Sequence, residues 1–574
     1  MTNRTTLCVS ALLGASAYSA LAAEPDTPPT AIYHNATVYT ARDDAPTAQA
    51  IAITGDTLTA VGSSEDVLAL AGDGTAIVNL AGRTVVPGLI DAHGHLAGLG
   101  SLQLGVVDLS GTTTYQQVID LVRAAADRTP AGDWIIGRGW DNESWPDTSL
   151  PAHDALSEAV PDHPVALSRV DGHALLANRA AMDVADVSPE TSNPPGGEVL
   201  RDDAGNITGV FVDNAESLVW RAVPETAFAD TAAVLLAAQE ACFSAGLTGV
   251  HDMGVSPGEL KVYQRLADSG DLKLRTYAVV SGAYAKDYFS EHGLTIGDTL
   301  TVRATKLYAD GAMGSRGAWL LEPYEDRPTD SEGNPYTGLA VTDIDNITDV
   351  ARHALEHGYQ VCTHAIGDRA NREVLNAYIT AAYVNPDGTG KPEVSPEVLR
   401  AARFRVEHAQ LLALEDILQF AGLGIIPSMQ PRHATSDMRW VVARVGQSRA
   451  RGAYAWQSLT RSGAPIAAGS DFPVEPHEPL LGFYAAVTRQ NADGYPEGGW
   501  MPDERLTRQQ ALRAFTINAA HAAFEEDRKG TLEPGKLADF VVLDTDIMTC
   551  EPAKILEASV LTTVLGGEVV YQND

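Results

Sequence analysis

Residues 87–96 read PGLIDAHGHL, an apolar run that ends in two histidines one residue apart. Successive side chains of a strand point to opposite faces, so His93 and His95 share a face if the strand continues through them. Two imidazoles on one face, just past a buried strand, would suit a metal ion. A bare HxH would equally suit a loop with two solvated histidines, and the rest of the chain has to separate these two interpretations.

The combination of an apolar run and a polar end recurs along the chain, with helix-like segments such as 230–246 and 348–358 in between. Apolar strands that alternate with amphipathic helices indicate a parallel sheet. Eight such units predict an α/β fold, a (β/α)8 TIM-like barrel whose active site lies at the carboxyl ends of the strands. The expected strands are 84–95, 247–254, 274–282, 304–311, 359–368, 403–410, 424–433 and 465–473.

Two parts of the chain do not fit the barrel, which is expected over residues 84–525. Residues 24–83 and 526–574 hold short strand-like pieces punctuated by glycine, and each part is too small to fold alone. We expect them to pair into one small β-sandwich. The stretch at about 101–229 is interpreted as an insertion after the first barrel strand, a lid or substrate-facing subdomain, with a decorative surface insertion as the alternative. It includes a hairpin expected around DAGN (203–206).

The first 23 residues have the pattern of a secretory signal peptide. Arg4 precedes an apolar stretch of small residues, and an A-x-A-like site predicts cleavage after Ala22 or Ala23. The stretch is short for a membrane span, so we expect a secreted or periplasmic protein without a membrane anchor. Three cysteines remain after cleavage, which implies no dense disulfide framework. The formal net charge of -35 argues against nucleic-acid partners.

Polar residues gather at the expected carboxyl ends of the strands. In a closed barrel those ends converge on one mouth, where four imidazoles, one carboxylate and one lysine could meet. Imidazole and carboxylate are ligands that suit Zn²⁺ and related ions. The residues are His93 and His95 on the first strand, Lys306 on the fourth, His364 on the fifth, His408 on the sixth and Asp471 on the eighth.

Lys306 lies inside an apolar strand, in a chain where only eight of the 40 basic residues are lysines. A buried ammonium group is costly without a partner. Lys306 could pair with a carboxylate such as Asp310. It could also react with CO₂ to form a carbamate, whose two anionic oxygens can bridge two cations.

In this order and at these strand positions, the motifs resemble the metal-dependent amidohydrolase superfamily. The closer resemblance is to the branch called amidohydrolase family 3, or YtcJ-like, and it covers nearly the whole mature chain. The motifs that carry it are PGLIDAHGHL, KLYADGAMGSR, THAIGDRA, RVEHAQ, SMQPRHATSDM, AAGSDFPVEP and the C-terminal GTLEPGKLADFVVLD.

The resemblance implies a divalent metal cofactor, one or two ions per chain, with zinc as the default. It implies hydrolysis of a non-peptide C–N bond in an amide, formamide, carbamate or cyclic amide. A metal-bound hydroxide would attack the carbonyl carbon, and Asp471 would serve as general base and then acid. The more buried metal would take His93, His95 and Asp471, the second would take His364 and His408, and carboxylated Lys306 would bridge both.

Further residues are candidates for catalysis or substrate contact. His433, after the seventh strand, is expected to contact the substrate or the transition state. Arg316 could bind an anionic group or pair with Glu322 or Asp326, and His251 could contact substrate or support the ligands. The candidates in the insertion are Trp140, Asp141, Asp171 and His173, of which Trp140 could instead pack in a core and Asp171 could instead cap a turn.

Two other functions stay open. One is a mononuclear deaminase of a cyclic amidine, against which the bridging Lys306 argues. The other is a non-catalytic metal-binding or regulatory barrel, against which the complete set of six ligands argues. The expected partner is a small-molecule substrate whose identity the sequence does not give, and a homo-oligomer stays open.

Overall fold

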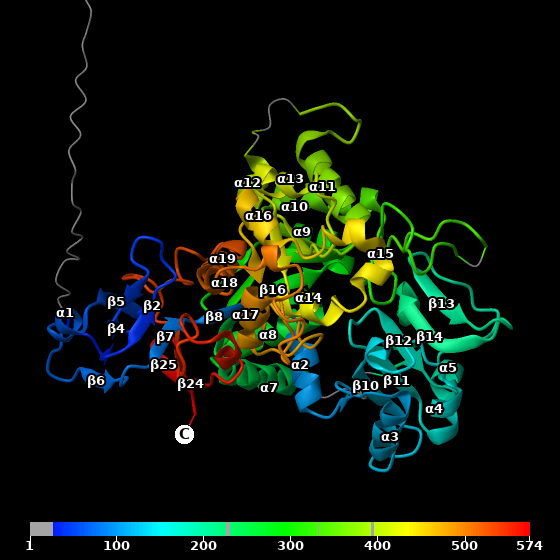
Figure 1. Ribbon diagram of the computed structural model, residues 1–574, viewed down its shortest axis with the longest axis horizontal. Coiled ribbons are helices and arrows are strands. Elements are labelled where there is room, and N and C mark those ends of the chain that lie inside the picture. Colours follow the sequence, from blue (N-terminus) through cyan, green and yellow to red (C-terminus); the bar gives the residue numbers. More distant parts are fainter. Residues whose placement is uncertain (1–26, 225–229, 331, 392–394, 396, 574) are drawn as a thin grey trace, which may run out of the picture.

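The computed structural model describes residues 27–224, 230–330, 332–391, 395 and 397–573. Figure 1 shows three units side by side: a β-rich unit on the left, a barrel in the centre and a second β-rich unit on the right. The expected signal peptide lies outside the described residues. Within the described residues, every helix is too short or too polar to cross a membrane.

The central unit is a sheet of eight parallel strands that neighbour one another in chain order. This order, with helices in the connections, confirms the predicted (β/α)8 barrel. A short strand, β17 (Thr295–Ile296), pairs antiparallel with one of its members. The eight strands are β8 (Leu89–Gly94), β15 (Leu247–Val255), β16 (Arg275–Ser281), β18 (Leu300–Tyr308), β19 (Gln360–Ala365), β20 (Arg405–His408), β21 (Ile426–Met429) and β22 (Ala467–Ala468).

Helices cover the outside of the barrel, and two of them coincide with the expected segments: α7 (Thr231–Ser244) and α10 (Ile344–His357). In α10 the buried Ile347, Val350, Ala351 and Ala354 recur at helical spacing and form one apolar face. The remaining barrel helices are α2 (Leu96–Gln103), α8 (Pro257–Ser269), α9 (Ala285–Glu291), α11 (Asp368–Tyr383), α12 (Val398–Ala402), α13 (Ile417–Leu423), α14 (Pro431–Asp437), α15 (Val441–Ala450), α16 (Trp456–Ser462), α17 (Pro479–Thr488), α18 (Arg508–Ala514) and α19 (Ile517–Ala522).

The first and eighth strands meet where the barrel closes. The Asp471 N–H donates to the His93 carbonyl at 2.7 Å, and the His95 N–H donates to the Phe472 carbonyl at 2.8 Å. These two bonds continue the pairing beyond the short strand β22. They place the two histidines of PGLIDAHGHL beside Asp471, although these residues are separated by nearly 380 positions in the chain.

A buried carboxylate reinforces the closure. Asp91 accepts hydrogen bonds from the Ser470 hydroxyl at 2.6 Å, from the Ser470 N–H and from the His93 N–H. Gly469 lies so close that a Cβ there would stand 2.4 Å from Asp91 Oδ1. Only a glycine therefore allows this approach.

One predicted strand is wrong, because residues 84–95 form two strands in two different sheets. β7 (Thr84–Pro87) pairs with β23 (Phe540–Leu543) in the left-hand unit, whereas β8 belongs to the barrel. The chain changes sheets at Gly88. A Cβ at Gly88 would lie 2.2 Å from Thr248 Oγ1, so the crossing requires a glycine.

The left-hand unit is the expected β-sandwich built from both chain ends. One sheet has the order β5 (Thr57–Gly62), β4 (Ala50–Thr54), β1 (Ala31–His34), β6 (Ala76–Asn79), and α1 (Ser64–Leu68) packs on it. The other has the order β25 (Glu568–Gln572), β24 (Val560–Leu565), β23, β7, β2 (Thr37–Tyr39), β3 (Thr47–Ala48). Apolar residues from both ends share one core, in which the rings of Tyr33 and Phe540 lie 5.0 Å apart. The two ends therefore fold as one unit.

The right-hand unit is the insertion after the first barrel strand, and it has a core of its own. The hairpin expected around DAGN is confirmed by β13 (Gly197–Arg201) and β14 (Ile207–Asp213). The sheet has the order β13, β14, β12 (Ala174–Ala177), β11 (Val165–Arg169), β10 (Ile135–Trp140), β9 (Val107–Asp108). Its helices include α3 (Tyr115–Ala126), α4 (Asp154–Ala159), α5 (Arg179–Val184) and α6 (Ser217–Trp220).

The barrel closure predicts the effect of a single methyl group. A Cβ at Gly94 would lie 2.5 Å from the Phe472 ring, so Gly94→Ala should lower the free energy of unfolding by about 1–3 kcal/mol through overpacking. Gly293→Ala is the matched control, because no heavy atom lies within 4 Å of its added Cβ. Thermal melting of both variants measures the difference. Equal melting temperatures for Gly94→Ala and wild type would contradict the packing described here.

Candidate metal centre

The six side chains predicted at the strand ends lie together at the mouth of the barrel. The His408 ring centroid lies 4.7 Å from that of His93 and 4.5 Å from that of His364. All of the six except His95 are buried. Their positions are His93 in β8, His95 at the start of α2, Lys306 in β18, His364 in β19, His408 at the end of β20 and Asp471 just after β22.

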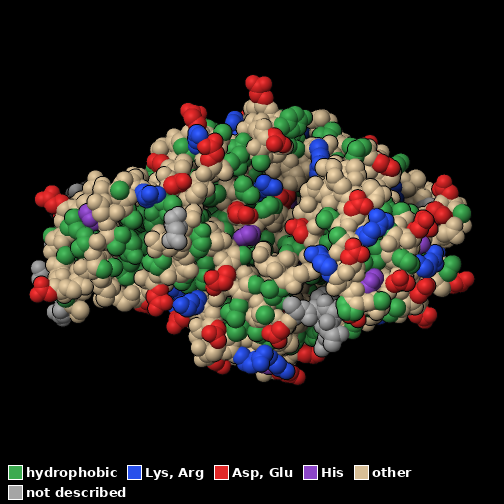
Figure 2. Space-filling model, turned by 90° about the horizontal axis from the view of Figure 1, so that it is seen from below, with side chains coloured by type: hydrophobic (Ala, Val, Ile, Leu, Met, Phe, Trp, Pro, Cys, Tyr) green, Lys and Arg blue, Asp and Glu red, His purple; other side chains and the backbone are tan. Residues whose placement is uncertain are grey.

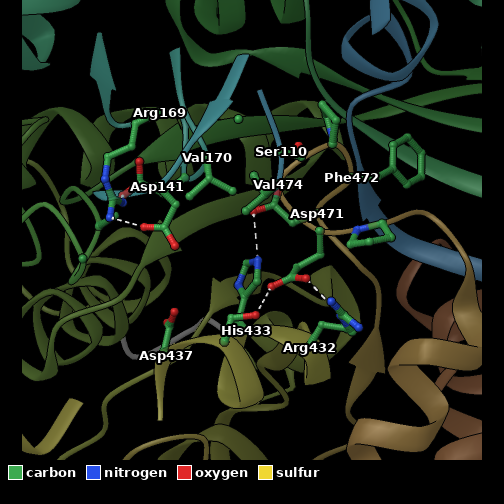
Figure 3. Close-up of a pocket in the computed structure, with 18 of the residues that line it drawn as sticks. Ser110, Asp141, Arg169, Val170, Arg432, His433, Asp437, Asp471, Phe472 and Val474 are labelled. Carbon is green, nitrogen blue, oxygen red and sulfur yellow. Dashed lines mark hydrogen bonds and ion pairs between the residues drawn. The ribbon is translucent and has the colours of Figure 1, made fainter. Parts of the chain in front are cut away.

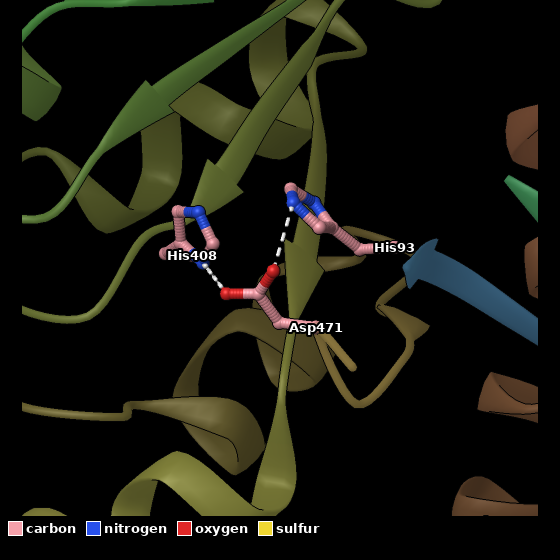
Figure 4. Close-up of side chains that lie close together, drawn as sticks. All are labelled: His93, His408 and Asp471. Atoms are coloured by element: carbon pink, nitrogen blue, oxygen red, sulfur yellow. Dashed lines mark ion pairs between the residues drawn. The ribbon is translucent and has the colours of Figure 1, made fainter. Parts of the chain in front are cut away.

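The Asp471 carboxylate lies between two imidazoles, as Figure 4 shows. Asp471 Oδ1 is 3.5 Å from His93 Nε2 and 3.0 Å from His95 Nε2, and Oδ2 is 3.9 Å from His408 Nδ1. One ligand atom each from His93, His408 and Asp471 can be chosen so that all three lie within 4.8 Å of one another. Such spacing fits a metal centre to which all three residues contribute ligands.

Two imidazoles are oriented by acceptors on their Nδ1 atoms. His93 Nδ1 lies 2.6 Å from Glu407 Oε2, and His95 Nδ1 lies 3.1 Å from the Met253 carbonyl oxygen. A carboxylate oxygen can only accept, so Nδ1 of His93 carries the proton and its Nε2 is left with a lone pair for a metal ion, the arrangement usual around metal-binding histidines. His95 Nε2 faces Asp471 Oδ1 at 3.0 Å, where a metal ion bound by both groups would take the place of a shared proton.

The other two imidazoles also face acceptors, His408 through Nδ1 and His364 through Nε2. His408 Nδ1 lies 2.8 Å from Gln430 Oε1, which leaves Nε2 free. His364 instead has Nε2 3.5 Å from the Gly311 carbonyl and 3.6 Å from Asp310 Oδ1, which leaves Nδ1 free. The protein therefore selects a different free nitrogen in His364 from that in the other three histidines.

Burial also favours the form of histidine that binds metal. It lowers the pKa of His93, His364 and His408 well below the ordinary value. These imidazoles are therefore neutral around pH 7, and neutral imidazole is the metal ligand.

Lys306 forms no ion pair with a carboxylate of the described part of the chain. Its Nζ lies 3.3 Å from His93 Nε2 and 4.7 Å from the centre of the Tyr308 ring. No carboxylate oxygen of the described residues lies within 4.0 Å of it, so the expected alternative of a pair with Asp310 is wrong. Asp310 is occupied by three backbone N–H groups, those of Ile366, Gly367 and Trp319.

Sequence reasoning missed a buried ion pair beneath the metal centre. Arg405 and Glu407 are fully buried, and Arg405 Nε lies 2.7 Å from Glu407 Oε1. Arg405 also donates to the Ala92 carbonyl at 2.6 Å, while Glu407 holds His93. The available signal was the run RVEH (405–408), since charged residues two apart in a strand share one face.

Three candidates for substrate contact instead make the other contacts that the sequence left open. His251 is 1% exposed and its Nδ1 accepts from Arg405 at 2.9 Å, so it supports the ion pair below the mouth. Trp140 is fully buried in the core of the insertion and donates to the Leu167 carbonyl. Arg316 pairs with Asp326 at 2.9 Å. The side chains of all three are thus committed to other contacts, away from the cavities next to the metal centre.

Two hollows open from the metal centre, with volumes of about 570 Å³ and about 520 Å³. Both lie between the barrel mouth and the insertion, and the molecule is hollowed between these units in Figure 2. Acidic side chains are spread over the surface in that view, in line with the net charge of -35. Residues that line both hollows include His173, His364, His408 and Asp471.

The first hollow is lined by ion pairs, which Figure 3 shows on two sides of it. Asp141 accepts from Arg169 and from Arg439, both at 2.9 Å. Arg432 pairs with Glu475 on the opposite side. Asp141 thus lies where it was predicted, at the edge of a cavity, but its carboxylate is already paired.

Three further predicted residues face the hollows. His433 accepts from Gln410 Nε2 through Nδ1 at 3.2 Å, and its Nε2 has no partner and lies 3.8 Å from Asp471 Oδ2. His173 Nδ1 lies 2.6 Å from Asp213 Oδ1. Asp171 pairs with Arg169 beside it.

Comparison with known proteins agrees with this site. Residues 76–571 match the model of the family described as "Amidohydrolase family". The chain is 32% identical to the amidohydrolase-family protein YtcJ of Bacillus subtilis (94% of this chain, 99% of that protein) and 27% identical to the N-substituted formamide deformylase of Arthrobacter pascens (94% and 97%). An uncharacterized metal-dependent hydrolase from Pyrococcus horikoshii superposes with a TM-score of 0.72 at 27% identity (91% and 99%).

The chain therefore belongs to the amidohydrolase family, in its YtcJ-like branch. This membership and the structural likeness support a metal-dependent hydrolase.

The buried ion pair yields a test of how the metal centre is held. Glu407→Gln removes the charge that Arg405 faces, which should destabilise the fold by about 3–5 kcal/mol. A glutamine oxygen can still accept from His93, so metal affinity should fall by only about tenfold, the lower end of the range for such partners. Thermal melting and titration against a competing chelator measure the two effects.

Glu415→Gln is the matched control, because Glu415 is an exposed partner of Arg372. If Glu407→Gln behaved like this control in both measurements, the supporting role of the buried pair would be refuted.

Proposed function

We propose that this protein hydrolyses a non-peptide C–N bond in an amide, formamide, carbamate or cyclic amide. The observation that carries the proposal is the convergence of four oriented imidazoles, Asp471 and an unpaired Lys306 at the point where the two hollows meet. This donor set fits zinc, which favours nitrogen and oxygen ligands. Divalent metal ions held there would activate water and polarise a carbonyl group.

The metal ligands are proposed residue by residue. His93, His95 and Asp471 would hold the more buried ion, and His364 and His408 the second. The nitrogens that the surrounding acceptors leave free are Nε2 of His93, His95 and His408, and Nδ1 of His364.

Asp471 is proposed as the general base and acid. Its carboxylate lines both hollows and lies 3.0 Å from His95 Nε2. From this position it can accept a proton from the attacking water and deliver that proton to the leaving nitrogen. Its backbone N–H is fixed by the barrel closure, which keeps the carboxylate at the mouth.

His433 is proposed to stabilise the negative charge that develops on the carbonyl oxygen. Gln410 donates to its Nδ1, so Nε2 carries the proton and can donate into the hollow. No described group accepts from that Nε2. A donor already aimed at a cavity costs little reorganisation during the reaction.

Lys306 is proposed to be carboxylated. Its neutral amine would form an N–C bond with CO₂ and release one proton, which gives an anionic carbamate. Among the described residues nothing anionic lies within 4.0 Å of Nζ to stabilise a permanent ammonium there. A carbamate between two cations removes that problem.

The substrate class follows from the site and one relative. The hollows give room on both sides of the metal centre for an acyl part and an amine part. The formamide deformylase of Arthrobacter pascens, which matches over 94% of this chain, makes N-substituted formamides the first compounds to assay. We also propose export of the mature chain, which an intact mass lacking 22 or 23 residues would test.

Metal counting tests the role of Lys306. We expect about two zinc ions per wild-type chain and a clear loss in Lys306→Ala, because the bridging group would be gone. Lys554→Ala, which removes an exposed lysine paired with Glu557, should match wild type. Inductively coupled plasma mass spectrometry measures the content. One ion in all three proteins would refute the bridging role and favour the mononuclear deaminase.

An assay of formate or amine release tests the reaction itself. Zinc-loaded wild type should hydrolyse members of a panel of N-substituted formamides and amides. Asp471→Asn should lose about 10²–10⁴-fold in kcat, and His433→Asn about 10²–10³-fold. Asp120→Asn, an exposed change on α3, is the control. Release of ammonia from cyclic amidines with no amide hydrolysis would favour deamination, and no turnover of either class would favour the non-catalytic alternative.

A further inference from the structure

The second hollow contains an arginine that forms no ion pair with a carboxylate of the described residues. Arg138 comes from β10 of the insertion and lines this hollow together with His93, His95 and Lys306. Its NH2 donates to the Val170 carbonyl at 3.2 Å, and its buried Nε has no hydrogen-bond partner. No carboxylate of the described residues lies within 4.0 Å of its guanidinium group.

Other arginines around the two hollows behave differently. Arg169 pairs with Asp141 and Asp171, and Arg432 pairs with Glu475. A buried guanidinium without an anion is costly, so unpaired arginines are uncommon in such places. The free charge of Arg138 is therefore a feature that packing alone does not explain.

A β-bulge aims Arg138 into the hollow. In the pairing of β10 with β11, Arg138 faces Ser168 and Trp140 faces Arg169, so Gly139 is the extra residue. Gly139 has a φ of 106°, a conformation that favours glycine. In a regular strand, residues two apart would share a face, but here Trp140 enters the core and Arg138 lines the cavity. Bulges beside active sites commonly redirect a side chain in this way.

The acidic side chains in the same hollow are already engaged. Asp171 pairs with Arg169, and Asp213 accepts from His173. Asp252 accepts from the Tyr263 hydroxyl at 2.6 Å. Glu216 accepts from Trp220 Nε1 at 3.2 Å. Asp213 Oδ2 is a buried acceptor without a partner, but no carboxylate of the described residues lies within 4.0 Å of the Arg138 guanidinium group.

Gly172 has no side chain, and this leaves one side of the Arg138 guanidinium group accessible. Gly172 has a φ of 70°, and a Cβ there would lie 3.7 Å from Arg138 NH1. The absence of a side chain at this position keeps the approach to the group open. A planar guanidinium with free N–H groups matches a carboxylate, which it can bind through two parallel hydrogen bonds.

We propose that Arg138 binds a carboxylate of the substrate, so that the enzyme prefers amides carrying a carboxylate away from the scissile C–N bond. This inference rests on the proposed hydrolase function and names its substrate class. Arg138 is a binding residue that selects and orients the substrate, while the reacting groups remain those of the metal centre.

The test compares two substrates of the same shape, an N-formyl amino acid and its carboxamide, by formate release from zinc-loaded protein. Wild type should favour the carboxylate in kcat/KM. In Arg138→Gln the ratio of the two values should fall by about 10- to 100-fold, the range for a hydrogen bond to a charged group. Arg138→Lys keeps the charge without the planar group and should fall in between. Arg123→Gln, an exposed arginine on α3 of the insertion, is the matched control.

A second readout does not need turnover. Calorimetry of zinc-loaded protein with 3-phenylpropanoate and 3-phenylpropanamide should show about tenfold weaker binding of the carboxylate in Arg138→Gln and an unchanged Kd for the amide. An unchanged carboxylate Kd in Arg138→Gln would overturn the proposal. A failure of the hydrolase proposal looks different, because wild type would then release formate from neither substrate while the binding difference remained.

Discussion

The closure of the barrel between its first and eighth strands is the constraint on which the site depends. β22 has only two residues, so the closure relies on the Asp471 N–H bond to the His93 carbonyl and on Asp91, which ties His93 to Ser470. These contacts join candidate metal ligands from opposite ends of the barrel sequence. Without them, the positions of His93 and Asp471 relative to each other would not be fixed. A hydrolytic metal centre needs that relation to be rigid, because ligand positions set the geometry of the reaction.

A second layer of polar contacts lies beneath the ligands and gives the site its electrostatic character. Arg405 and Glu407 bring a buried ion pair into the barrel interior, and Glu407 then orients His93. Such a pair is weak evidence for stability, because desolvating two charges offsets most of their attraction. Here it fixes which imidazole nitrogen of His93 is left free for a metal ion. The buried pair therefore costs desolvation energy, but it orients His93.

The sequence alone predicts the architecture and the convergence of the six candidate ligands, for a simple physical reason. Strand ends of a parallel barrel converge, so a polar residue after each apolar run is brought to one place whatever its sequence distance. For His251 the same logic left substrate contact and a supporting role open; β15 continues to Val255, so His251 lies below the mouth, against Arg405. It also could not find Glu407, whose role depends on a neighbour 314 positions away.

Short sequence patterns did not predict the outcome at two other places, Trp140 in the insertion and the first predicted strand. Trp140 follows a glycine bulge, and that bulge sends it into the core, although its neighbours line a cavity. Residues 84–95 read as one apolar strand, yet close contact with Thr248 at Gly88 divides them between two sheets. In both places the outcome depends on packing partners that are distant in the chain. The periodicity of a short window does not contain that information.

The central claim is that the surrounding acceptors choose the nitrogens that bind metal. Anomalous diffraction at the zinc absorption edge, on crystals of the zinc-loaded protein, tests it most directly. The account predicts zinc at the barrel mouth, bound by Nε2 of His93, His95 and His408 and by Nδ1 of His364. Zinc at another location, or bound to His364 through Nε2, would contradict it.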